Sequence, residues 1–70
     1  MNITLNGKPH IVDNQCTVEQ LIEQLDLTGK RVAVEVNLDI IPRSEHAQHQ
    51  LQEGDKVEVV HAIEIGRAHV

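Results

Sequence analysis

Hydrophobic and polar residues alternate at the start of the chain, which predicts two short strands, over residues 1–5 and 8–12. Asn6-Gly7 lies between them and is typical of a type I′ hairpin turn, because both central residues of that turn need a positive φ angle. Pro9 has no backbone N–H to give to a neighbouring strand. We therefore expect the second strand to lie at an edge of the sheet.

The apolar pattern then changes to the spacing of a helix, which we predict over residues 18–26. Thr17 and Gln20 have the spacing of a capping box, in which each side chain bonds the backbone N–H of the other residue. We expect Gly29 to end the segment as its C-cap. The apolar stripe of the helix consists of residues three and four apart, namely Val18, Leu21, Ile22 and Leu25.

Three further strands are predicted in the second half of the chain. Residues 31–37 alternate strictly, residues 40–41 form a short strand that ends at Pro42, and residues 56–63 form the last strand. The last strand has apolar residues on both faces, which favours a central position in the sheet. Residues 43–50 are polar, and we expect an irregular segment there with one helical turn around Glu45 to His49.

This order of strands and helix predicts a two-layer α+β domain, with a mixed sheet and one helix packed on one face. If the first and last strands pair in parallel at the centre, the arrangement is a ubiquitin-like β-grasp. We assign residues 1–63 to this domain. Residues 64–70 form a C-terminal tail, which we expect to be disordered because it has little apolar surface to anchor it.

Composition and charge narrow the classes of partner. The chain contains no aromatic residue, so it has little material for an aromatic-lined pocket of the kind that small ligands occupy. Six basic and eleven acidic residues give a formal net charge of −5. This charge argues against nucleic acid as a partner, because phosphate binding needs a basic surface. It favours docking on a basic protein surface.

The number of cysteines and the length of the apolar runs indicate the cellular compartment of the protein. Cys16 is the one cysteine of the sequence, so no internal disulfide can form and we expect a cytoplasmic location. No apolar run is long enough to span a membrane, so we expect no membrane association.

Cys16 has no histidine near it in sequence to activate it. We predict that it packs against Leu21 as a hydrophobic staple ahead of the helix.

Two histidines offer a candidate metal pair. His46 and His49 are three residues apart and could meet on one helical turn. Two ligands without a nearby cysteine are weak grounds for a metal site, so we expect both to be solvated loop residues and no metal to bind. The sequence shows no nucleophile–base spacing and no phosphate loop. We therefore predict that the chain is not an enzyme.

Four segments together resemble the ThiS family of small sulfur-carrier proteins of thiamin biosynthesis. They begin with Met-Asn-Ile-Thr-Leu-Asn-Gly-Lys and continue with residues 17–25, 34–43 and 51–63. The resemblance covers residues 1–63 and implies the β-grasp fold. The small subunit of molybdopterin synthase shares this fold, but its sequence pattern fits less well.

The resemblance also implies an activity. In the family, an E1-like enzyme uses ATP and magnesium to adenylate the carboxylate of a C-terminal glycine. Sulfur then displaces AMP to give a thiocarboxylate, and thiazole synthase takes that sulfur. The resemblance therefore implies two partners, an E1-like adenylating enzyme and thiazole synthase, and no cofactor bound to the carrier itself.

The tail departs from the family pattern. Where the family has Gly-Gly, this chain has Glu64 and Ile65 followed by Gly66, and it continues with residues 67–70. Gly66 is the candidate site of adenylation and thiocarboxylate formation if the chain is processed there. Three explanations stay open: an altered or replaced end, a tail that is cut after Gly66, or a domain that has lost carrier chemistry. The last would leave a non-covalent β-grasp interaction module.

Four residues are candidates for partner docking: Arg43, Val60, Ala62 and Ile63. Val60 and Ala62 could form an exposed apolar strip on the sheet face opposite the helix, which would be a docking site. The alternative, that both are buried, is equally compatible with the sequence. Arg43 follows Pro42 in a step that recurs in the resemblance, and it could contact a partner or be an ordinary surface arginine.

Overall fold

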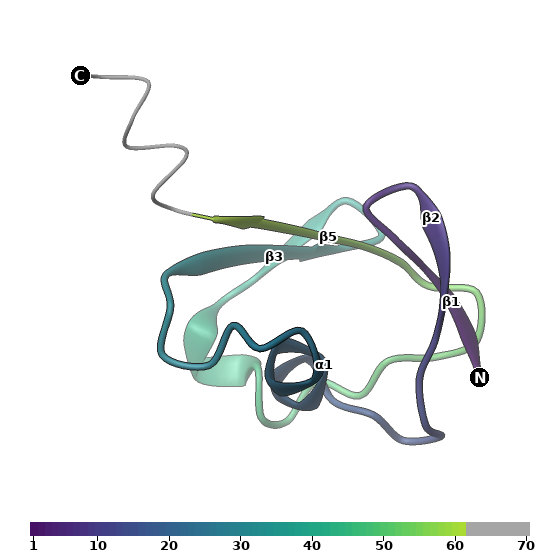
Figure 1. Ribbon diagram of the computed structural model, residues 1–70, viewed down its shortest axis with the longest axis horizontal. Coiled ribbons are helices and arrows are strands. Elements are labelled where there is room, and N and C mark those ends of the chain that lie inside the picture. Colours follow the sequence, from purple (N-terminus) through teal and green to yellow (C-terminus); the bar gives the residue numbers. More distant parts are fainter. Residues whose placement is uncertain (62–70) are drawn as a thin grey trace.

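The first and last strands of the chain lie side by side at the centre of one sheet (Figure 1). The structure, a computed structural model, describes residues 1–61. Its elements in chain order are β1 (Asn2–Leu5), β2 (Lys8–Ile11), α1 (Val18–Gln24), β3 (Val32–Val36), β4 (Asp39–Ile41), a 3₁₀ turn η1 (Arg43–Glu45) and β5 (Lys56–His61). The expected order of strands and helix is therefore confirmed.

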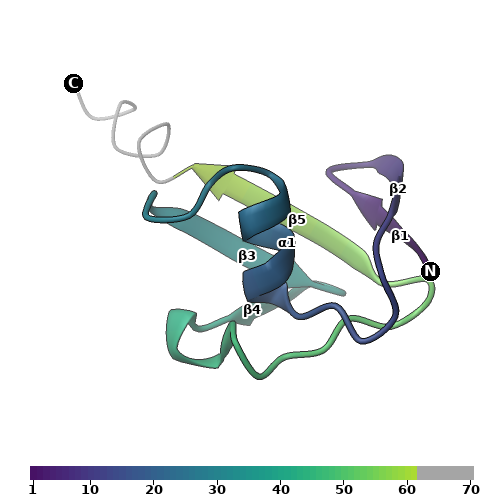
Figure 2. The ribbon, with the colours of Figure 1, turned by 60° about the horizontal axis from the view of Figure 1, so that its bottom comes forward.

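The five-stranded sheet has the order β2-β1-β5-β3-β4. β1 and β5 pair in parallel, and the other neighbours are antiparallel, so the sheet is mixed. Figure 2 shows the β1–β2 hairpin and the β3–β4 pair on opposite sides of β5. The parallel pair at the centre is the feature that defines a β-grasp, and both the predicted central position of the last strand and the edge position of Pro9 are confirmed.

Two asparagines attach the hairpin turns to β5. Asn6 and Gly7 have φ angles of 50° and 83°, as the predicted type I′ turn requires. The Asn6 amide accepts a hydrogen bond from the Val59 N–H at 2.8 Å and donates to the Val59 carbonyl at 3.3 Å. Asn37, at the β3–β4 turn, accepts from the Lys56 N–H at 3.0 Å. Each side chain thereby continues a strand ladder past the point where the backbone turns away.

The helix begins as predicted. The Thr17 hydroxyl accepts from the Gln20 N–H at 3.2 Å, and the Gln20 side chain accepts from the Thr17 N–H at 2.9 Å. These reciprocal bonds form the capping box.

The predicted helix end was wrong. α1 ends at Gln24 with Leu25 as its C-cap, and Asp26 follows with a φ angle of 61°. The Asp26 N–H bonds the Glu23 carbonyl and the Leu27 N–H bonds the Ile22 carbonyl, both at 3.0 Å, which is the Schellman pattern. Aspartate tolerates the left-handed conformation better than most residues, so Asp26 replaces the expected glycine. Gly29, with a φ angle of 81°, lies in the next turn.

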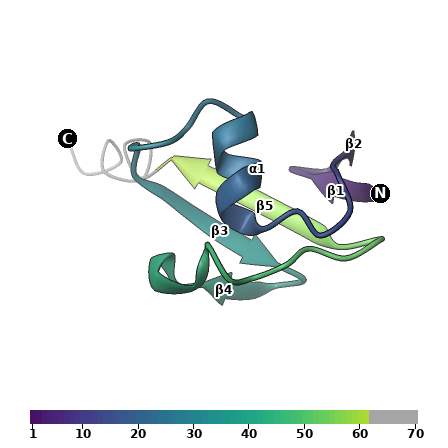
Figure 3. The ribbon, with the colours of Figure 1, turned by 90° about the horizontal axis from the view of Figure 1, so that it is seen from below.

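The core lies between α1 and one face of the sheet (Figure 3). Alternation in the strands directs one set of side chains towards the helix, so Val34 and Val57 are buried whereas their neighbours in sequence are not. Cys16 and Leu21 are both buried in this core, as the predicted staple requires. The buried apolar residues are Ile3, Val12, Cys16, Val18, Leu21, Ile22, Val34, Val36, Ile41, Leu51, Val57 and Val59. Among residues 1–61, no helix is long and apolar enough to cross a membrane.

Candidate partner-docking surfaces

The sheet face opposite α1, here called the open face, carries Val60. Cross-strand register places Val60 beside Ala33 and Glu58 beside Glu35, and Ile40 of β4 is the other neighbour of Glu35. The exposed fraction is 38% for Val60 and 74% for Ile40. Of the two alternatives left by the sequence, Val60 is therefore exposed and not buried, although its docking role stays a prediction.

A pair of like charges lies between these apolar positions. Glu35 and Glu58 are directly opposite each other on β3 and β5. Like charges in this position destabilise a sheet. A basic group of a partner placed between them would relieve this repulsion, so the open face suits a partner surface that combines basic and apolar side chains.

Ala62, Ile63 and Gly66 lie outside the described residues, as do residues 64–70 of the predicted disordered tail. The described part of the chain reaches His61, which pairs with Val32 at the start of β3.

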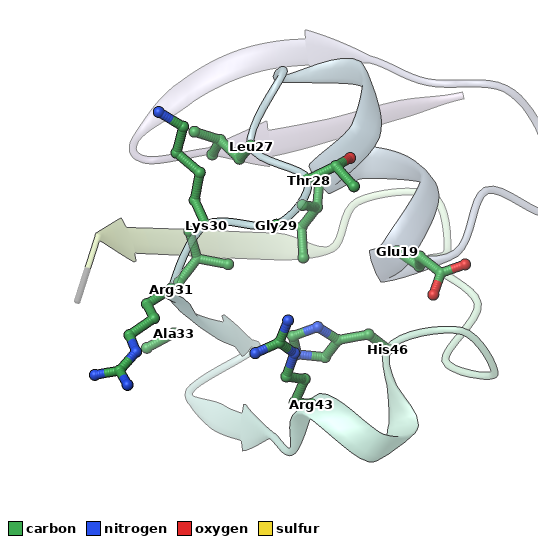
Figure 4. Close-up of a pocket in the computed structure, with 11 residues that line it drawn as sticks. Glu19, Leu27, Thr28, Gly29, Lys30, Arg31, Ala33, Arg43 and His46 are labelled. Atoms are coloured by element: carbon green, nitrogen blue, oxygen red, sulfur yellow. The ribbon is translucent and has the colours of Figure 1, made fainter. Parts of the chain in front are cut away.

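Arg43 lies in a groove that also includes Ala33, the cross-strand neighbour of Val60. This groove has a volume of about 450 Å³ and lies between the C-terminal end of α1, the start of β3 and the η1 turn. Figure 4 shows Arg43 and His46 on the η1 side of this groove and Thr28 and Lys30 on the other. We call it the η1 groove; its lining residues are Glu19, Ile22, Leu27, Thr28, Gly29, Lys30, Arg31, Val32, Ala33, Arg43 and His46.

His46 is buried, so the expectation that it is a solvated loop residue was wrong. Its exposed fraction is 7%, and its ring Nε2 lies 3.0 Å from the Ile41 carbonyl oxygen. A carbonyl oxygen only accepts, so Nε2 carries a proton and donates it in this bond. The ring thereby holds the η1 turn against the end of β4.

The backbone around His46 also completes the start of α1. The Glu19 N–H donates to the His46 carbonyl and the Val18 N–H donates to the His49 carbonyl, both at 3.0 Å. These N–H groups belong to the first turn of α1, where the backbone N–H groups have no hydrogen-bond acceptor within the helix. The segment from η1 to His49 is therefore a structural cap, and residues 1–61 contain no cluster of three or more potential metal-binding side chains.

Cys16 has the properties of a core residue. Burial raises the pKa of its thiol, and the nearby negative charge of Asp13 raises the pKa further. A thiol with a raised pKa forms little of the nucleophilic thiolate at neutral pH. This agrees with the predicted packing role.

The sequence of this chain is similar to a known family and to parts of longer proteins. The sequence model of the ThiS family matches residues 3–64. The chain is 40% identical over 60 residues to a thiazole synthase of Paramagnetospirillum magneticum, a match that covers 86% of this chain and 18% of that protein. It is 41% identical over 63 residues to a thiazole synthase of Magnetococcus marinus, covering 90% and 19%. The chain thus spans about a fifth of the length of these two relatives.

A shorter relative and a solved structure agree with the family match. The chain is 44% identical over 41 residues to the sulfur carrier protein ThiS of Escherichia coli, covering 59% of this chain and 62% of that protein. The crystal structure of the thiamine biosynthesis protein ThiS from Geobacter metallireducens superposes with a TM-score of 0.77 at 33% identity. That superposition covers 87% of this chain and 93% of the other.

Proposed function

This chain belongs to the ThiS family, and we propose that it carries sulfur as a tail thiocarboxylate for thiazole formation in thiamin biosynthesis. The family match over residues 3–64 is the observation that carries this proposal. The shared fold with the ThiS structure from Geobacter metallireducens supports it, at 33% identity over most of both chains.

The fold suits a protein that presents a reactive tail. β5 pairs with β1 at its start, at Lys56 and Val57, and with β3 along its length to His61, so the strand that leads into the tail is anchored in the sheet. Asn6 and Asn37 bond the backbone of the same strand. An anchored strand ahead of the tail would allow a partner to bind the tail without loss of the carrier's own structure.

The carrier's chemistry takes place on the tail. In the proposed reaction a tail carboxylate oxygen attacks the α-phosphate of ATP, pyrophosphate leaves, and a sulfur nucleophile then forms a C–S bond at the acyl carbon as AMP departs. Gly66 is the proposed carboxylate-bearing residue if the chain is processed there. Ala62 and Ile63 lie between the end of β5 and this glycine, and we propose that they contact the partner.

The partner supplies the catalytic groups. Within residues 1–61 the one thiol is buried and no metal-binding cluster is present. We therefore propose that this chain is not itself an enzyme, and that ATP and magnesium bind to an E1-like adenylating enzyme. Such a reaction would take place in the cytoplasm.

Thiazole synthase is the proposed receiver of the sulfur. Two relatives named thiazole synthase each contain a segment that is about 40% identical to this chain. A ThiS-like segment within a longer synthase supports a direct functional link between carrier and synthase. We propose that the open face around Val60 docks on these partners.

A non-covalent interaction module is the second candidate. Glu64 and Ile65 stand where the family has glycines, and their side chains add bulk and charge to a tail that must thread a narrow channel. A domain of this kind would dock through the same surfaces without accepting sulfur.

Sulfur loading distinguishes the two candidates. The full chain and the same chain ending at Gly66 are each incubated with an E1-like adenylating enzyme, ATP, magnesium and a sulfur source, and the intact mass of each is measured, with omission of ATP as the control. The carrier proposal predicts an ATP-dependent product in which sulfur replaces one carboxylate oxygen. An unchanged mass of both chains, under conditions that load the Escherichia coli carrier, would leave the interaction module.

A further inference from the structure

The η1 groove has a charge opposite to that of the whole chain. Of the five basic residues among residues 1–61, three line it, namely Lys30, Arg31 and Arg43, whereas Glu19 is the one of the ten acidic residues in the same range that does so. The chain as a whole carries a net charge of −5. Most of the basic residues in the described part of the chain therefore lie around this groove.

The groove also offers apolar contacts. Ile22, Leu27 and Val32 contribute to its lining, and all three belong to or pack against the hydrophobic core. A ligand with apolar side chains could therefore bury them there while its charged groups meet the basic residues.

The basic side chains are spread out and do not converge on one point. Figure 4 shows the ends of Lys30 and Arg31 pointing in different directions, with Arg43 on the opposite wall beside His46. All three residues are exposed. One small anion could not contact the three charges together, whereas an extended chain with several spaced negative charges could.

The groove is close to the root of the tail. Val32 lines the groove and pairs directly with His61, the last residue of β5. A partner that holds the tail beyond residue 61 therefore has part of its surface within reach of Arg31 and Lys30.

We propose that the η1 groove binds an extended segment of a partner protein in which acidic and apolar residues alternate. This inference rests on the proposed function, because the segment would belong to the enzyme that processes the tail. Alternation suits an extended chain, since side chains of successive residues point to opposite sides. The open face, with Glu35 and Glu58, would contact a basic part of the same partner, so the two surfaces together fix its orientation.

The acidic residues outside the groove favour a short peptide over a nucleic acid as the ligand. Nine of the ten acidic residues among residues 1–61 lie outside the groove, and they would repel the continuous phosphate backbone of a longer polyanion. A short acidic segment confined to the groove avoids most of this repulsion.

The direct test is an NMR titration of the isotope-labelled full chain with a short capped peptide in which glutamate and leucine alternate. The proposal predicts that the amide signals of residues 27–33 and 43–46 shift, and that the shifts weaken as salt is added. A peptide with lysine in place of glutamate should leave these signals unchanged. Shifts confined to the open face, or equal binding of the lysine peptide, would overturn the proposal.

Charge reversal with matched controls gives the second test. Arg31→Glu and Arg43→Glu should each weaken peptide binding by about fivefold, because each removes an exposed ion pair and adds repulsion. Lys8→Glu and Lys56→Glu make the same change in net charge outside the groove and should have little effect. An equal loss in all four variants would show a general charge effect, and equal binding of a short oligothymidine would show a site for polyanions; either would contradict the proposal.

The carrier function is measured separately. Sulfur loading of the wild-type chain reports the proposed function, whereas peptide binding to the purified chain does not depend on the tail reaction. If the chain is loaded with sulfur but does not bind the peptide, the groove proposal is refuted and the proposed carrier function is not. With the adenylating enzyme, Arg43→Glu should raise KM for the carrier and leave kcat unchanged, since the groove is proposed to bind the partner and takes no part in the chemistry of the tail carboxylate.

Discussion

Removal of the Asn6 side chain should destabilise the fold, because this amide joins the first hairpin to β5. Asn6→Gly keeps a residue that readily adopts the φ angle of 50° but removes the bonds to Val59 at 2.8 and 3.3 Å. The shorter bond should contribute about 1 kcal/mol and the longer one about 0.5 kcal/mol. We therefore expect Asn6→Gly to lower the free energy of unfolding by about 1.5 kcal/mol.

Asn6→Ala adds a conformational cost to the loss of the two bonds. A Cβ atom in the left-handed region costs roughly 1 kcal/mol compared with glycine, so the total loss should be about 2.5 kcal/mol. In a chain of this size such a loss lowers Tm by about 10–20 °C. Lys8→Ala, at an exposed position of β2, should change stability by less than about 0.5 kcal/mol and is the control.

The assay is urea unfolding followed by far-UV circular dichroism, because the chain has no aromatic residue for fluorescence. Hydrogen exchange of the Val59 amide gives a local measurement, and it should speed up in both Asn6 variants. Equal stability of the glycine and alanine variants would refute the conformational part of the reasoning. Wild-type stability and unchanged exchange in Asn6→Gly would refute the bonding part.

Three further predictions concern single residues. Thr17→Ala removes the hydroxyl of the capping box and should cost about 1 kcal/mol in chemical unfolding, whereas Thr17→Ser should cost little. Leu38→Gly should stabilise the fold by roughly 0.5–1 kcal/mol, because Leu38 is 87% exposed and has a φ angle of 73° that glycine adopts without strain; Leu38→Ala, which keeps the strain, should show no such gain in thermal unfolding. The raised pKa of the Cys16 thiol means that the folded state disfavours the thiolate, so stability is fully present below the pKa of an unfolded cysteine and should fall as pH rises above about 8.5. Unfolding curves across this pH range should show the fall in the wild type and a smaller one in Cys16→Ala, and equal falls in both would assign it to other groups.

Local sequence signals predicted most of the fold. Asn6-Gly7 fixed the first hairpin through its need for positive φ angles, and Thr17 with Gln20 located the start of the helix. The alternation in residues 31–37 identified the side of β3 that faces the core. The apolar residues on both faces of the last strand predicted its central position, because such a strand has neighbours on both sides.

Two kinds of feature were not predictable in this way: those that depend on contacts between separate segments, and those for which more than one residue could meet the same backbone requirement. His46 is buried because its ring bonds Ile41 and its carbonyl caps α1, and neither partner is indicated by the residues around it. The helix end was assigned to Gly29 because glycine is the common C-cap residue, although Asp26 adopts the same left-handed conformation. The position of Arg43 in a groove with residues 27–33 likewise follows from the position of η1 beside α1, which no local pattern encodes.

The intact mass of the protein, isolated from cells that are actively making thiamin, tests the central claim most directly. The carrier account predicts a species that ends in glycine and carries sulfur in place of one carboxylate oxygen. If only unmodified protein is found, while another carrier in the same cells is loaded with sulfur, the account is contradicted and the chain acts as a non-covalent docking module.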